Sequence, residues 1–287
     1  MNKIGIQFGY WSRDLTFDFL YYIQRAADLG FDIFECPTDS MLEMPKLKLQ
    51  EIREIAEEKN IELTFSVGLS KEYDISSKDK ATRERGIEYL KRNIEFVHKM
   101  NGTVIGGVST GAWLATMDEG DTDKRPYVER SVKSVKEIAK TAEDYNVIHS
   151  VEVVNRFEQF IINTSAEGVE FVNMVGSPNL KILLDTFHMN IEEDNIGEAI
   201  ITAGDKLGHL HICENNRKLP GQAHIPWEEI ASALKKINYK SHVVMEPFVQ
   251  SGGVVGRALF IWSDRSPKDM DAAAKESLNF IRSKLNT

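Results

Sequence analysis

Four polar residues of chemically useful types stand at or near the ends of apolar runs in the second half of the sequence. They are Glu152, Asp185, His211 and Glu246. Three carboxylates gathered at one place would repel each other and acquire raised pKa values unless protons or a cation neutralised them. A divalent metal ion is the simplest answer. A set of mainly oxygen ligands with one imidazole suits Mn²⁺, Mg²⁺ or Co²⁺, whereas Zn²⁺ sites more often use several His or Cys ligands.

Each of these residues also has a purely structural interpretation. An acid at the end of a strand can cap the following helix, and a single histidine in a strand is more often a hydrogen-bonded core residue than a metal ligand. No single residue therefore carries the prediction of a metal site. The prediction depends on a fold that brings all four side chains together.

The elements that must position them are eight short apolar runs separated by amphipathic segments, which is the pattern of repeated βα units. The runs are Ile4 to Phe8, Asp32 to Cys36, Glu62 to Val67, Val104 to Val108, Ser150 to Val154, Lys181 to Asp185, Gly208 to Cys213 and His242 to Glu246. Between them, apolar residues recur at the three- and four-residue spacing of helices. Examples are Leu47, Ile52, Ile55 and Ala56, and Val132, Val135, Ile138 and Ala139.

We therefore predict an α/β protein that is a single (β/α)8 TIM-barrel domain over residues 1–287. Eight βα units without an antiparallel hairpin signal favour a closed barrel, and no glycine-rich phosphate turn of a doubly wound sheet is present. The carboxyl ends of all strands in such a barrel meet at one mouth, where barrel enzymes carry their active sites. The four polar residues would converge there.

The composition limits the class of partner. The 287 residues carry a formal net charge of −9, so the field of the whole protein repels nucleic-acid phosphates and anionic membrane surfaces. No apolar stretch approaches the roughly 20 residues needed to cross a bilayer, and the first residues lack the apolar segment of a signal peptide. Cys36 and Cys213 are too far apart for a CxxC motif and are expected to be reduced thiols. We expect a cytoplasmic protein without nucleic-acid or membrane partners.

Around these polar residues the sequence resembles the D-tagatose 3-epimerase and D-allulose (psicose) 3-epimerase family, a group within the xylose-isomerase-like barrels. The resemblance extends over nearly the whole chain. Its most specific stretches are Glu152-Val-Val-Asn-Arg-Phe-Glu158, Asp185-Thr-Phe-His-Met-Asn-Ile-Glu-Glu193, Gly208-His-Leu-His211, Asn216-Arg217 and Met245-Glu-Pro-Phe248. By this resemblance Glu152, Asp185, His211 and Glu246 match the family's metal ligands. Glu158, His188 and Arg217 match residues that hold the sugar near its carbonyl.

The resemblance implies a metal-dependent ketose 3-epimerase that acts on a free ketohexose or a related keto-sugar. Mn²⁺ is the expected ion, with Co²⁺ or Mg²⁺ as alternatives. A hydrogen on the carbon beside a ketone is only weakly acidic, so a Lewis acid must stabilise the cis-enediolate that its removal produces. Two carboxylates on opposite faces of that carbon can remove and return the proton. Glu152 and Glu246 would be these catalytic groups, and the configuration at C3 would invert.

The loops that choose the substrate depart from the family pattern. Gln7 stands where an aromatic residue is common and Leu15 where a Trp is common, at positions that normally line the far end of the sugar. Gly107 and Trp113 fit the family and are predicted to contact the substrate, but the rest of the stretch 109–117 does not fit. Cys213, Glu214 and Asn215 replace a smaller, glycine-containing pattern after the seventh strand. The substrate's length and any modification are therefore left open.

Several alternatives remain. The same enediolate could expel a β-substituent, which would make the protein a lyase or dehydratase of a keto-inositol or 3-keto-glycoside, and return of the proton to the adjacent carbon would make it an isomerase. Metal-dependent endonucleases share the superfamily, but the acidic balance and the total of 7 histidines speak against them. A non-catalytic sugar-binding protein would not need every metal and proton-transfer position filled.

The resemblance also implies a homodimer or homotetramer. The last amphipathic segment, with Ala272, Ala273, Leu278 and Ile281, would either cover the barrel or join a subunit interface.

Overall fold

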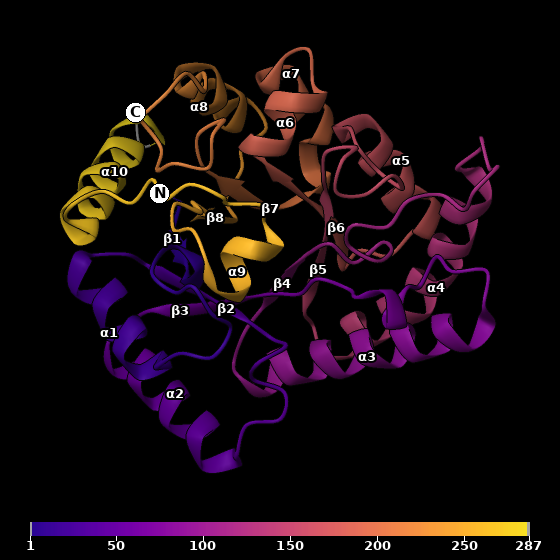
Figure 1. The fold of residues 1–287 in the computed structure, drawn as a ribbon, viewed down its shortest axis with the longest axis horizontal. Helices are drawn as coiled ribbons and strands as arrows, with labels where there is room; N and C mark the ends of the chain where they lie inside the picture. Colours follow the sequence, from indigo (N-terminus) through magenta and orange to yellow (C-terminus); the bar gives the residue numbers. More distant parts are fainter. Residues whose placement is uncertain (1, 286–287) are drawn as a thin grey trace.

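The computed structural model describes residues 2–285, and its eight strands form a closed parallel barrel (Figure 1). The strands follow each other around the barrel in chain order, and β8 pairs with β1 to close it. They are β1 (Ile4–Gln7), β2 (Ile33–Pro37), β3 (Glu62–Ser66), β4 (Val104–Gly107), β5 (Ile148–Val153), β6 (Leu180–Asp185), β7 (Leu207–Ile212) and β8 (His242–Met245). The predicted TIM barrel is confirmed, and each predicted strand is present with its ends shifted by one or two residues.

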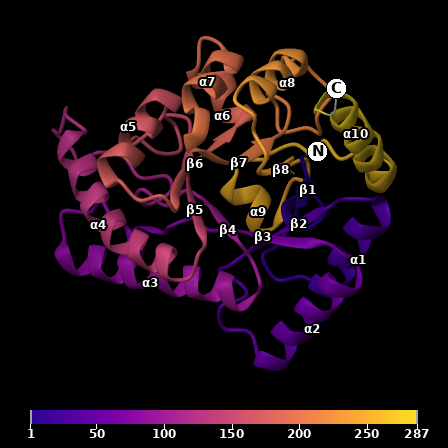
Figure 2. The same ribbon diagram turned by 180° about the vertical axis from the view of Figure 1, so that it is seen from behind.

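All the helices among the described residues except α9 surround the barrel as an outer ring (Figures 1 and 2). The helices are α1 (Phe19–Leu29), α2 (Lys46–Glu58), α3 (Lys80–Lys99), α4 (Arg125–Asp144), α5 (Ser165–Val175), α6 (Thr186–Glu192), α7 (Ile196–Ala203), α8 (Trp227–Lys236), α9 (Gly253–Ala258) and α10 (Met270–Leu285). Three short 3-10 helices are η1 (Phe8–Tyr10), η2 (Lys71–Tyr73) and η3 (Gly204–Lys206). None of the helices among residues 2–285 has the length and apolar character needed to span a membrane.

The helical periodicity of the sequence corresponds to buried faces. In α4 all four apolar residues that predicted the helix are buried against the barrel. In α2 Ile52 and Ala56 are buried, but Leu47 is exposed because it lies in the first turn, before the apolar stripe reaches the barrel. Packing of one apolar stripe per helix against the strands is what holds this ring in place.

The last helix covers the barrel next to the chain's first helix. Helix α10 packs between α1 and α8, and its residues Ala274, Leu278 and Ile281 are buried. The apolar face predicted for this segment is therefore used within the chain, although Ala272 is on its exposed side.

Helix α9 differs from the other helices because it lies inside the ring, over the barrel itself (Figures 1 and 2). Its residues Val254, Val255 and Ala258 line the same pocket as residues from the carboxyl ends of the strands. The segment after β8 therefore covers part of the mouth at which the predicted site residues should lie.

Candidate active site

The four predicted ligands meet at the mouth of the barrel. Glu152 lies in β5, Asp185 ends β6, His211 lies in β7, and Glu246 directly follows β8. One potential ligand atom from each residue lies within 4.8 Å of the corresponding atoms of the other three, and all four residues are buried. Asp185 also caps α6, since its Oδ1 accepts a hydrogen bond of 2.9 Å from the backbone N–H of Phe187. The structural interpretation of this acid, as a helix cap, is thus confirmed, and the same residue belongs to the group of potential ligands.

The electrostatics of the cluster favour a bound cation. Burial raises the pKa of Glu152 well above its usual range, and the neighbouring charge of Glu246 raises it further. Burial also raises the pKa of Asp185 to about 6, although the Arg217 guanidinium acts in the opposite direction. Because a metal ion binds the deprotonated carboxylates, it would replace protons that the cluster otherwise retains.

His211 could supply a fourth donor through one of its two ring nitrogens. Its Nε2 lies 2.8 Å from Glu35 Oε1, inside the barrel. Its Nδ1 is buried without a hydrogen-bond partner among the described residues and lies 3.2 Å from Glu246 Oε1. Three carboxylates and one unengaged imidazole nitrogen are a donor set that fits a hard divalent ion such as Mn²⁺, Mg²⁺ or Co²⁺.

Arg217 is held above the cluster by two kinds of contact. Its Nη1 donates to Asp185 Oδ2 at 2.5 Å and to Glu246 Oε2 at 2.9 Å. Its guanidinium lies over the Phe187 ring, 4.0 Å from the ring centroid. The backbone of Arg217 has a φ of 62°, a left-handed conformation that is uncommon outside glycine and is enriched at functional sites. Arg217 is therefore buried in the pocket although it lies in a loop.

A chain of hydrogen bonds runs from Trp113 to His188, which lies beside Glu152. Trp113 Nε1 donates to Glu158 Oε2 at 3.0 Å, and Glu158 Oε1 accepts from Asn155 Nδ2 at the same distance. Asn155 contacts His188 Nδ1 at 2.8 Å, and His188 Nε2 lies 3.5 Å from Glu152 Oε1. His188 also lies 3.3 Å from Arg217 through its Nε2. Residues from four separate segments are thus coupled around one carboxylate.

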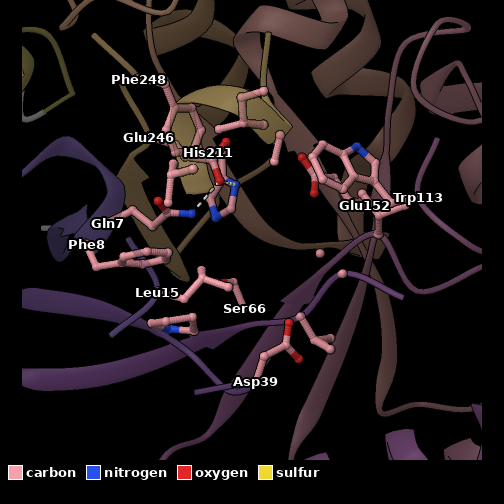
Figure 3. A pocket seen from close by; sticks show the side chains of 18 of the residues that line it. Gln7, Phe8, Leu15, Asp39, Ser66, Trp113, Glu152, His211, Glu246 and Phe248 are labelled. Carbon is pink, nitrogen blue, oxygen red and sulfur yellow. Dashed lines mark hydrogen bonds and ion pairs between the residues drawn. The ribbon is translucent and has the colours of Figure 1, made fainter. Parts of the chain in front are cut away.

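Most of these residues line one pocket, part of which Figure 3 shows from close by: Trp113, Glu152, Glu158, His188, His211, Arg217 and Glu246. Glu246 and His211 lie together on one side of it in this view, whereas Asp39 and Ser66 lie on the other side. Gly107, at the end of β4, also lines it with a φ of 121°. A Cβ there would lie 2.2 Å from the Val67 carbonyl oxygen, so this wall requires glycine.

The departures from the family pattern fall into two groups. Gln7 and Leu15 line the pocket and change its wall directly. Glu214 does not: it is buried and its carboxylate accepts hydrogen bonds from the backbone of Gly221, Gln222 and Ile225 and from Trp227 Nε1, which orders the loop before α8.

Beside these two groups, Cys213 places its Sγ 3.8 Å from Asp185 Oδ1.

Four further residues lie at or next to the site and were not predicted to do so. Glu35 lies in β2, His209 lies in β7, Asn155 lies in the turn after β5, and Asp39 lies in the loop after β2. Glu35 had a usable signal, because it is a charged residue inside an apolar strand run, where an unpaired charge is costly.

Comparison with known proteins agrees with this geometry. The model of the xylose isomerase-like TIM barrel family matches residues 23–284. The chain belongs to this family. A D-psicose 3-epimerase from Ruminiclostridium cellulolyticum is 44% identical over 285 residues, which cover 98% of this chain and 97% of the relative. An L-ribulose 3-epimerase from Mesorhizobium japonicum is 32% identical, and the match covers 100% of this chain and 95% of the relative.

A solved structure shows the same relationship in three dimensions. The D-psicose 3-epimerase from Clostridium cellulolyticum H10, crystallised with D-tagatose, has a TM-score of 0.95 and 42% identity, and the match covers 99% of each chain. The predicted membership and the predicted class of enzyme are confirmed: this xylose isomerase-like barrel is a carbohydrate epimerase.

Proposed function

We propose that this chain acts as a single domain and as a metal-dependent ketose 3-epimerase, which interconverts the C3 epimers of a free ketohexose or related keto-sugar. The observation that carries the proposal is the approach of Glu152 and Glu246 at the mouth. These two acids come from β5 and β8, which are not neighbours in the barrel, and their carboxylates belong to a group of atoms within 4.8 Å. A sugar carbon held over them would meet one carboxylate on each side.

Glu152 and Glu246 would act as a general base and a general acid in the same turnover. One carboxylate removes the proton from C3, and the other, in its protonated form, delivers a proton to the opposite face of the same carbon. The two acids end with exchanged protonation states and reset through solvent. Their roles reverse for the opposite epimer.

The metal ion is proposed to be Mn²⁺, with Co²⁺ or Mg²⁺ as alternatives, held by Glu152, Asp185, His211 and Glu246. When bound, it would supply Lewis-acid stabilisation of the negative charge that develops on the sugar's oxygens. The support for this proposal is the oxygen-rich donor set and the unengaged His211 Nδ1.

The remaining predicted residues would orient the sugar. Arg217 and His188 present donors at the mouth beside Glu152 and Glu246, where the carbonyl end of the substrate must lie if C3 is to reach both acids. Glu158 is held by Trp113 and would keep His188 in place through Asn155. Trp113 and Gly107 would form the wall of the pocket against which the sugar packs.

A homodimer or homotetramer is also proposed. Three large apolar side chains on loops next to the mouth are exposed: Phe157, Phe260 and Trp262, with Trp262 71% exposed. Exposed aromatic residues in one region are typical of protein interfaces. Light scattering on a sizing column tests this proposal, and a monomer at micromolar concentration would refute it.

The test of the function is proton exchange in D₂O. The protein is loaded with Mn²⁺ and separately with Co²⁺, incubated with D-fructose, D-tagatose, D-allulose or L-ribulose, and followed by NMR. Deuterium at C3 with formation of the 3-epimer is the expected result. Glu152→Gln should abolish both, while Glu167→Gln, a helix carboxylate outside the pocket, should leave both unchanged.

Two other outcomes would redirect the assignment. Loss of a substituent from a keto-glycoside, without exchange into free ketoses, would make the protein a lyase. Deuterium at C1 would indicate an aldose–ketose isomerase. Absence of exchange with every ketose, while the metal is bound, would overturn the proposed epimerase.

A further inference from the structure

A second cluster of ionisable side chains lies inside the barrel beneath the proposed metal ligands. Glu35 in β2 contacts two histidines of β7: its Oε1 lies 2.8 Å from His211 Nε2, and its Oε2 lies 2.8 Å from His209 Nε2. Thr64 Oγ1 in β3 donates to the same Oε2 at 2.9 Å. Glu35, Thr64 and His209 are fully buried, and His211 is 1% exposed.

The pattern of contacts leaves the Glu35 carboxylate no freedom to rotate. One oxygen is used by His211, and the other is used by both His209 and Thr64. The two histidines are two residues apart on β7, so their side chains point to the same side of the strand, into the barrel. A carboxylate that is held at both oxygens restricts the orientation of the imidazole that it contacts.

On the basis of the metal-dependent function proposed above, we propose that Glu35 is a positioning residue that holds His211 with its Nδ1 turned toward Glu152, Asp185 and Glu246. An imidazole whose Nε2–H donates to a carboxylate has its lone pair on Nδ1. That nitrogen is buried without a hydrogen-bond partner among the described residues, and it lies 3.2 Å from Glu246 Oε1. The contact with Glu35 would thus set both the orientation of the His211 ring and its tautomer.

The contacts of Glu35 agree with this role. Thr64 Oγ1 donates to Glu35 Oε2, and the Nε2 atoms of His209 and His211 each lie 2.8 Å from one of its oxygens. Both oxygens of Glu35 are therefore placed as acceptors. A charged partner binds an imidazole N–H more strongly than a neutral one and makes the opposite nitrogen a better metal ligand.

The competing explanation is that Glu35 only stabilises the barrel interior. The chain offers a matched control, because a second strand glutamate contacts a strand histidine in the same way. Glu62 Oε1 lies 2.7 Å from His242 Nε2, at the amino ends of β3 and β8 and outside the ligand group. Removal of either carboxylate charge should lower stability, but only Glu35 lies next to a proposed ligand.

The experiment compares Glu35→Gln with Glu62→Gln in the full chain. Mn²⁺ binding is measured by titration calorimetry on metal-free protein, and the melting temperature is measured with and without Mn²⁺. We expect Glu35→Gln to weaken Mn²⁺ binding by roughly 10- to 100-fold, the usual effect of losing a group that orients a metal ligand, and to reduce the rise in melting temperature caused by Mn²⁺. Glu62→Gln should keep the wild-type affinity.

A second variant keeps the proposal testable if Glu35→Gln does not fold. His209→Asn removes one of the two contacts that hold Glu35 Oε2, leaves Thr64 on that oxygen and keeps the contact of Glu35 with His211, so it should weaken Mn²⁺ binding to a smaller extent. Wild-type affinity in both the Glu35 and His209 variants, or equal weakening by Glu62→Gln, would overturn the positioning role alone. Failure of the wild-type protein to bind Mn²⁺ would instead overturn the proposed metal-dependent function, and the positioning role with it.

Discussion

Gln7 Nε2 donates a hydrogen bond of 2.7 Å to Glu246 Oε1 across the seam where β1 and β8 close the barrel. The other end of the Gln7 side chain is also held, because its Oε1 accepts from the backbone N–H of Gly9 at 3.2 Å. Figure 3 shows the amide of Gln7 directed at Glu246 beside His211. A residue at a position where the family usually has an aromatic side chain thus contacts a proposed catalytic acid directly.

Replacement of Gln7 by Leu should lower kcat/KM by roughly 10- to 100-fold, because a hydrogen bond to a charged group contributes about 1.5–3 kcal/mol. The loss should fall mainly on kcat, since Glu246 is proposed to act on the reacting carbon. Steady-state kinetics with the best ketose measures it. Leu15→Met, which changes the same wall without touching Glu246, is the control, and equal losses in both variants would show that the wall shape matters and the hydrogen bond does not.

Mn²⁺ affinity should rise with pH. Burial raises the pKa of Asp185 to about 6 and the pKa of Glu152 well above its usual range, so both carboxyls of the metal-free protein retain protons at mildly acidic pH. A cation must displace those protons, and the competition disappears as the pH rises through the raised pKa values. Calorimetry at pH 6 in two buffers of different ionisation enthalpy should detect proton release, and its absence would contradict the assignment of these ligands.

Arg217→Lys should lower kcat/KM by about 100-fold or more. A single ammonium group cannot contact Asp185, Glu246 and His188 from one plane and lie over the Phe187 ring, as the guanidinium does. Arg156→Lys is the matched control at the same end of the barrel, because Arg156 pairs with Glu192 but is 63% exposed and lies outside the pocket. Kinetics of the two variants should differ clearly, and similar values would refute the role of Arg217.

Asp39→Asn should change KM more than kcat. Asp39 lies on the side of the pocket away from Glu246 and His211 in Figure 3, where it can accept hydrogen bonds from hydroxyls distant from the reacting carbon. The expected result is a several-fold rise in KM for ketohexoses, which corresponds to a loss of about 1 kcal/mol of binding free energy, with kcat near the wild-type value. A ketopentose, which is one carbon shorter, serves as the comparison substrate. An equal fall of kcat for both sugars would place Asp39 in the reaction itself.

Much of the fold follows from local patterns in the sequence. Apolar runs of strand length and apolar residues at helical spacing repeat often enough to predict eight βα units, and the ends of parallel strands must share one mouth. The sequence alone therefore predicts that four polar residues converge at this mouth: Glu152, Asp185, His211 and Glu246. Arg217 depended on the resemblance, because an arginine in a loop has no local signal of burial.

Closure of the barrel decided what the sequence could not. Gln7 and Glu246 are 239 positions apart, and Glu35 and His211 are 176 positions apart, so no short-range periodicity relates them. Their contacts exist because β1 pairs with β8 and because Glu35 and His211 both point into the barrel interior. The sequence by itself determined which residues stand at the strand ends. Only the tertiary structure decided which side chains hold them, since those partners meet through the geometry of a closed sheet.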